Sequence, residues 1–140
     1  MTSPIQRVLE ALTIGVCIWL VATAWSLSPD DRGFGTHEQL DLAPCGFLQT
    51  TGHPCPSCGM TTSFSYMAEG RPASGIRANP AGAMLFVLVF ITPFWILHSW
   101  AMGRQTLRFL AGYKGAWWLT ATLLIILVSW FYKDFAMARE

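Results

Sequence analysis

Three of the four cysteines lie within fourteen residues, from Cys45 to Cys58. Cys55 and Cys58 form a CxxC pair, a spacing that suits one disulfide, a redox-active dithiol or two ligands on one metal ion. Cys45 could add a third metal ligand, a resolving thiol or a disulfide partner. No histidine follows Cys58 directly, which excludes the CxxCH motif of haem attachment. The residues therefore point to thiol chemistry.

A zinc site is the first interpretation of these thiols. Structural zinc is held by four tetrahedral ligands, often three cysteines and one histidine. His53 lies two residues before Cys55, a tight spacing for two ligands on one ion, so His37 is an equal candidate. The sequence thus predicts that Cys45, Cys55 and Cys58 bind zinc together with either His53 or His37.

Two other interpretations stay open. A permanent disulfide could staple the loop and leave one thiol over, although the odd number of cysteines in the loop argues mildly against it. Alternatively, Cys55 and Cys58 could cycle between dithiol and disulfide as a membrane thiol-disulfide oxidoreductase, with Cys45 resolving or stapling. The sequence favours metal and staple equally and redox catalysis less, so we expect a non-catalytic protein.

A short helix is predicted over about 59–69, directly after the CxxC pair. Apolar side chains recur at i, i+4 and i+7 from Met60, and Gly70 supplies a stop signal. We expect Ser57 to cap this helix, so that both thiols of the pair lie at the positive end of its dipole. The hydroxyls of residues 61–63 are expected to bond back within the helix. Its apolar face would cover the ends of membrane helices at the interface.

Long uncharged segments flank the cysteine loop. The chain is 53% hydrophobic and 12% charged, about half the charged share of a typical soluble domain. No Asp, Glu, Lys or Arg occurs in 11–28, 80–103 or 115–132, and about 20 apolar residues span a bilayer core. The sequence predicts an all-α integral membrane protein with three transmembrane helices, at 1–28, 80–103 and 115–132.

The first uncharged segment has a second interpretation. Arg7, the apolar stretch after it and Ala22-Thr-Ala24 together resemble a cleavable signal peptide. The stretch stays apolar to Leu27, so a retained helix is favoured.

The remaining segments connect or follow these helices. Residues 29–79 form a cysteine-rich loop, whose length predicts either a function or independent folding. Residues 104–114 form a short basic turn, and residues 133–140 a charged tail. The basic residues of the turn favour a cytoplasmic position for it, which places the cysteine loop on the extracytoplasmic side.

The second helix carries two proline signals. Asn79 is a strong N-cap, and Pro80 suits the first helical position, where its missing N–H costs nothing. Pro93 lies in the middle of the helix and leaves the carbonyl of Val89 without its usual donor, which predicts a kink.

These motifs resemble a family known as domain of unknown function 2752. Its members share a first cysteine, a TGxPCPxCGxT loop and an ANP-like entry to the next helix. This chain has Cys45-Gly-Phe, Thr51-Gly-His-Pro-Cys-Pro-Ser-Cys-Gly-Met-Thr61 and Asn79-Pro80. The similarity covers about 42–93, and Thr62 stands where the family commonly has Arg. The resemblance implies a small multi-pass protein of the bacterial inner (cell) membrane and lends no biochemical activity.

Charge and size set the expected partners. A formal net charge of +1 gives no basic field for nucleic acid, so no nucleic acid partner is expected. The lipid bilayer is the first partner, and a protein this small could also assemble with other membrane protein subunits. The uncharged segments 11–28, 80–103 and 115–132 carry no acidic or basic side chain that would mark an ion or proton path.

Overall fold

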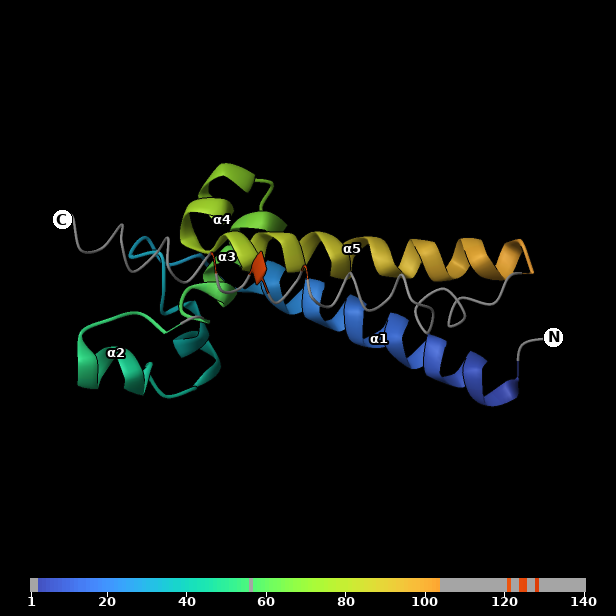
Figure 1. Ribbon diagram of the computed structural model, residues 1–140, viewed down its shortest axis with the longest axis horizontal. Helices are drawn as coiled ribbons and strands as arrows, with labels where there is room; N and C mark the ends of the chain where they lie inside the picture. Colours follow the sequence, from blue (N-terminus) through green and yellow to red (C-terminus); the bar gives the residue numbers. More distant parts are fainter. Residues whose placement is uncertain (1–2, 56, 104–120, 122–123, 126–127, 129–140) are drawn as a thin grey trace.

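The computed structural model describes residues 3–55, 57–103, 121, 124–125 and 128. Regular structure in these ranges is helical, and none of their residues forms a strand. Two long helices run antiparallel beside each other, and four short helices gather as a cap at one end of the pair (Figure 1). The cap holds the three clustered cysteines.

The first long helix, α1, spans Pro4–Ser26, and the second, α5, spans Pro80–Ala101. Each begins with the same device: a polar N-cap side chain followed by proline. Ser3 Oγ accepts from the backbone N–H of Gln6 at 3.2 Å, and Asn79 Oδ1 accepts from that of Gly82 at 2.9 Å. α5 stays helical on both sides of Pro93.

Both long helices are able to cross a membrane by their length and composition. α1 has 23 residues and α5 has 22. In the most apolar 18-residue segment of each helix, only 17% and 28% of the segment is buried. The core helix of a soluble protein would bury far more of its apolar side chains. Here Trp19 is 65% exposed and Phe94 is 61% exposed.

The third predicted span, 115–132, lies outside the described residues apart from four helical positions. The predicted basic turn at 104–114 and the tail at 133–140 lie outside them entirely. The described chain therefore contains two candidate spans.

The cap consists of a 3-10 helix, η1 (Thr36–Leu40), and three short α-helices. These are α2 (Gly46–Thr51), α3 (Met60–Ala68) and α4 (Pro72–Ala78). α3 is the central element, because it contacts η1, α4 and both long helices. The predicted helix after the CxxC pair is therefore present, and it lies inside the cap.

The prediction that the Ser57 side chain caps the N-terminus of α3 is wrong. Gly59 is the residue before the first helical turn, at φ +76°, and no side chain caps the helix. The left-handed conformation costs glycine little, and at Gly59 it turns the chain from the CxxC segment into α3. The hydroxyl of Ser57 lies instead 3.2 Å from the sulfur of Cys55.

The most buried face of α3 is polar, which the apolar periodicity did not predict. Thr62 and Ser63 are fully buried, and their hydroxyls bond to other segments rather than back within the helix. Thr62 Oγ1 lies 2.8 Å from Thr36 Oγ1, and Ser63 Oγ donates to the carbonyls of Gly75 at 2.8 Å and Asn79 at 3.0 Å. Buried backbone carbonyls at helix ends need such donors, so these hydroxyls hold α3 to η1, α4 and α5.

Candidate metal centre

The three loop cysteines converge in space. The sulfur atoms of Cys45, Cys55 and Cys58 all lie within 4.8 Å of one another, and those of Cys45 and Cys55 are 3.5 Å apart. All four cysteines are thiols. The fourth, Cys17, is buried on α1 and is not part of this group. We call Cys45, Cys55 and Cys58 the cysteine triad.

Tight local turns position the triad. Cys45 is the residue immediately before α2. The N–H of Cys58 donates to the carbonyl of Cys55 at 2.9 Å, and the N–H of Met60 donates to that of Ser57 at 3.0 Å. These two turns bring both cysteines of the pair to the start of α3.

The surroundings of Cys45 favour its thiolate. The backbone N–H of Leu48, in the first turn of α2, lowers the pKa of the Cys45 thiol. The neighbouring Cys55 thiol acts in the same direction, and partial burial opposes it. The thiolate is the form that binds metal ions and attacks disulfides, so this shift serves either chemistry.

The predicted histidines lie near the triad in sequence, but the described group contains cysteines only. His37 Nε2 lies 3.2 Å from the carbonyl of Ala43, two residues before Cys45. His53 is exposed. The structure therefore brings together the three sulfurs of the predicted zinc set and does not place an imidazole nitrogen within the same 4.8 Å group.

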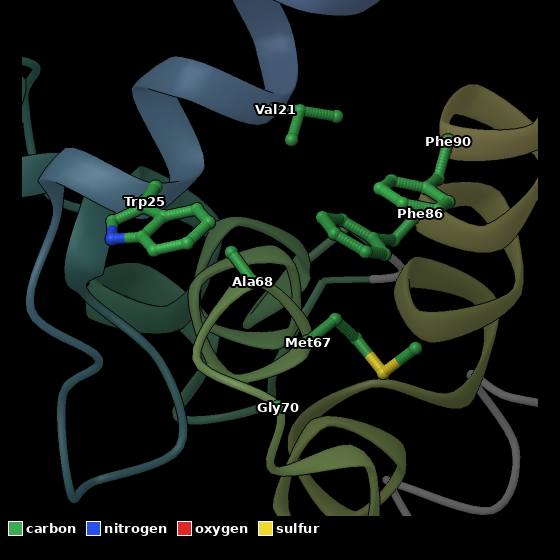
Figure 2. Close-up of a pocket in the computed structure, with 7 residues that line it drawn as sticks. All are labelled: Val21, Trp25, Met67, Ala68, Gly70, Phe86 and Phe90. Carbon is green, nitrogen blue, oxygen red and sulfur yellow. The ribbon is translucent and has the colours of Figure 1, made fainter.

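A separate pocket of about 360 Å³ lies where α1, α3 and α5 meet (Figure 2). The described residues that line it carry no titratable or nucleophilic side chain, and Met67 supplies the only sulfur among them. Binding sites normally combine an apolar lining with a few convergent polar groups, and the side chains that line this pocket are apolar apart from the indole N–H of Trp25. Its lining residues are Val21, Trp25, Met67, Ala68, Gly70, Phe86 and Phe90. The triad is therefore the better candidate site.

One buried ionisable side chain was missed by the sequence analysis. Glu10, on α1, is 4% exposed, and its carboxylate accepts from Trp100 Nε1 at 2.5 Å and from Gln6 Nε2 at 3.0 Å. Glu10 comes just before the uncharged segment 11–28, and the sequence analysis gave it no role. The contact instead joins the beginning of α1 to the end of α5, away from the cap.

Residues 45–92 match the family model described as "Protein of unknown function (DUF2752)". This cysteine-bearing segment is similar to the DUF2752 family. The DUF2752 match contains the whole triad, α2, α3, α4 and the first part of α5, in agreement with the resemblance seen in the sequence. No curated protein and no solved structure matches the chain.

Proposed function

We propose that this is an integral membrane protein whose cap is held in shape by a zinc ion on the cysteine triad. The convergence of three sulfurs within 4.8 Å carries the proposal. Zinc–sulfur bonds of about 2.3 Å in a tetrahedron put neighbouring sulfurs about 3.8 Å apart, whereas a disulfide needs about 2.05 Å. The 3.5 Å between the Cys45 and Cys55 sulfurs is close to the zinc value.

The composition of the cap interior supports a structural role for the ion. The four cap helices have only five to nine residues each. The largest fully buried side chains of the described chain are Asn79, Thr36, Thr62, Pro54, Ser63 and Ser65, of which five are polar. Such an interior buries little apolar surface, and small units of this kind commonly depend on a metal or disulfides for stability. Zinc bound only by the folded form would contribute directly to folding.

A fourth ligand completes the proposed site, and His53 and His37 are its candidates. The contact between His37 Nε2 and the Ala43 carbonyl resembles the bond that a ligating histidine makes with its second nitrogen. That arrangement would leave Nδ1 for the ion. His53 has the shorter path in sequence, since Cys55 is two residues away. Zinc affinities of His37→Ala and His53→Ala compared with wild type identify which one binds.

Metal analysis of the purified full-length protein tests the proposal. We expect about one zinc per chain, and loss of that zinc in Cys45→Ser, Cys55→Ser and Cys58→Ser. Cys17→Ser is the matched control and should keep its zinc, because Cys17 lies outside the triad. Wild-type protein that contains no zinc and takes none up would contradict the proposal.

The membrane assignment rests on the two long helices. Their apolar side chains are mostly exposed, which suits contact with lipid or with other membrane subunits. α1 packs along α5 and contacts α3, which favours a retained helix over a cleaved signal. We place the protein in the bacterial inner membrane with the cap on the extracytoplasmic side.

Extraction and labelling test that placement. Alkaline carbonate should leave the protein in the membrane pellet. The mass of the purified protein should include the residues of α1. An impermeant maleimide should label Gln49→Cys, an exposed position of α2, in intact cells. Labelling only after the cells are broken would place the cap inside.

Thiol-disulfide exchange is the second candidate function, with Cys55 and Cys58 as the active pair. Cys45 is half-buried, its sulfur lies 3.5 Å from that of Cys55, and its thiol has a lowered pKa. These features favour Cys45 as a resolving thiol. In this mechanism a thiolate attacks the disulfide of a partner, forms a mixed disulfide and releases one partner thiolate. A second thiolate of the chain then attacks the mixed disulfide, which releases the other partner thiolate and leaves a disulfide in the chain. Replacing one cysteine of the pair by serine would then trap a mixed disulfide with the partner, and its absence would argue for the zinc site.

A further inference from the structure

Asn79 connects the cysteine triad to the start of α5. It is 1% exposed, and its amide makes two bonds of opposite direction. Nδ2 donates to the carbonyl of Cys58 at 3.1 Å, while Oδ1 accepts from the N–H of Gly82 at 2.9 Å. One side chain therefore caps α5 and holds the backbone of a triad cysteine.

Helix capping alone does not require asparagine at this position. Serine, threonine or aspartate would supply the oxygen that accepts from the first turn. Aspartate lacks a donor, and serine or threonine would have to accept and donate through one hydroxyl oxygen. The amide separates the two functions, with the acceptor on Oδ1 and the donor on Nδ2. The bond to Cys58 is therefore a property of asparagine that the capping role leaves unused.

The backbone of Asn79 is itself held in place. Its carbonyl accepts from Ser63 Oγ at 3.0 Å and from the N–H of Ala83 at 3.0 Å. Ser63 also donates to the carbonyl of Gly75, within α4. The buried hydrogen bond to the Cys58 carbonyl thus ties the backbone of Cys58 to the fixed position of Asn79.

We propose that Asn79 is a positioning residue for the cysteine triad. By holding the Cys58 carbonyl against the first turn of α5, it fixes the Cys58 sulfur where it meets those of Cys45 and Cys55. The inference deepens the proposed zinc site and rests on it for its metal-binding readout. Second ligand shells of this kind typically change metal affinity by about 10–100-fold.

The variant Asn79→Ser separates the two bonds, because serine keeps the capping oxygen and lacks the amide donor. Purified full-length protein is titrated with Zn²⁺ against a chelator, and with Co²⁺ as a spectroscopic probe. We expect zinc affinity to fall about tenfold or more and the thiolate-to-cobalt absorption band to shift. The thermal midpoint of the metal-free protein should stay near that of wild type. Where the midpoint of Asn79→Ser falls, Asn79→Thr, a second capping residue without the amide donor, is used in its place.

Ser3→Ala is the matched control. It removes the corresponding N-cap of α1, whose oxygen accepts from Gln6 at 3.2 Å, and it does not touch the triad. Zinc affinity and the cobalt spectrum should therefore stay as in wild type. A loss of affinity equal to that of Asn79→Ser would mean that any lost helix cap weakens the site, and it would overturn the inference.

A metal-independent readout separates failure of this inference from failure of the zinc proposal. Cys58 is only 6% exposed, so its alkylation in metal-free protein reports how firmly its backbone is held. Asn79→Ser should accelerate alkylation of Cys58 several-fold relative to Cys45. If wild type binds zinc and Asn79→Ser binds it equally well, the inference fails and the zinc proposal stands. If wild type binds no zinc, the zinc proposal fails and the Cys58 rate decides: faster alkylation supports the positioning role, and an unchanged rate overturns it.

Discussion

Gly82→Ala is expected to force α5 away from α3 and loosen the cap around the triad. A Cβ at position 82 would lie 3.0 Å from Ser63 Cβ, 3.1 Å from Ser63 Oγ and 3.3 Å from Met60 Cα. Carbon atoms in optimal contact are about 3.5–4.0 Å apart, so the closest pair is short by about 0.5–1 Å. Met60 Cα belongs to the backbone and cannot rotate away, which leaves movement of a helix as the relief.

The magnitude follows from two opposing effects. Overpacking of this kind costs about 1–3 kcal/mol, and alanine regains up to about 1 kcal/mol of helix propensity. The net loss of cap stability is therefore about 1 kcal/mol. Because about 1.4 kcal/mol is a factor of ten, alkylation of the buried Cys58 through local opening should accelerate about fivefold in metal-free protein.

Gly15→Ala provides the matched control on α1. No atom lies within 4 Å of a Cβ built there, so only the gain in helix propensity remains. Cys58 should then react at the wild-type rate or more slowly. The reasoning is refuted if Gly82→Ala leaves the rate within twofold of wild type, or if Gly15→Ala accelerates it equally.

Two further predictions concern η1 and the residues just before it. Thr36→Val removes the partner of the Thr62 hydroxyl and of the Asp30 N–H, at 2.8 Å and 3.0 Å, and should destabilise the cap by about 1–3 kcal/mol in thermal unfolding; the exposed Thr13→Val should stay within about 0.5 kcal/mol, and equal losses would contradict us. Second, the side-chain hydrogen bond from Arg32 holds the pKa of Asp30 below its ordinary 3.8, so this pair adds stability that is fully present above about pH 4 and is lost as the pH falls through the depressed value. Unfolding measured against pH should show that acid-side loss in wild type and lack it in Arg32→Ala, and identical profiles would refute the pairing.

The sequence was a good guide where the controlling interaction is local. Asn79 and Pro80 predict the start of α5 because N-cap preference depends on neighbouring residues only. The position of α3 after the CxxC pair likewise follows from a short periodicity and a glycine stop. The grouping of the triad could also be predicted, because Cys55 and Cys58 are three residues apart and Cys45 is close to them in sequence.

The misses involve partners that are distant in sequence or depend on backbone geometry. The buried hydroxyl of Thr62 bonds to a residue 26 positions away, and the carboxylate of Glu10 accepts from a residue 90 positions away. Periodicity within one helix cannot report such partners. Ser57 carried the right side chain for a cap, but the left-handed conformation of Gly59 starts the helix two residues later. The bond from Asn79 to the Cys58 carbonyl was missed as well, because helix capping already explained an asparagine at this position.

Zinc K-edge X-ray absorption of the purified full-length protein tests the central claim most directly. The proposed site predicts bound zinc with three sulfur ligands at about 2.3 Å and one nitrogen at about 2.0–2.1 Å. Protein without zinc, or zinc with fewer than three sulfur ligands, would contradict a metal centre built on Cys45, Cys55 and Cys58.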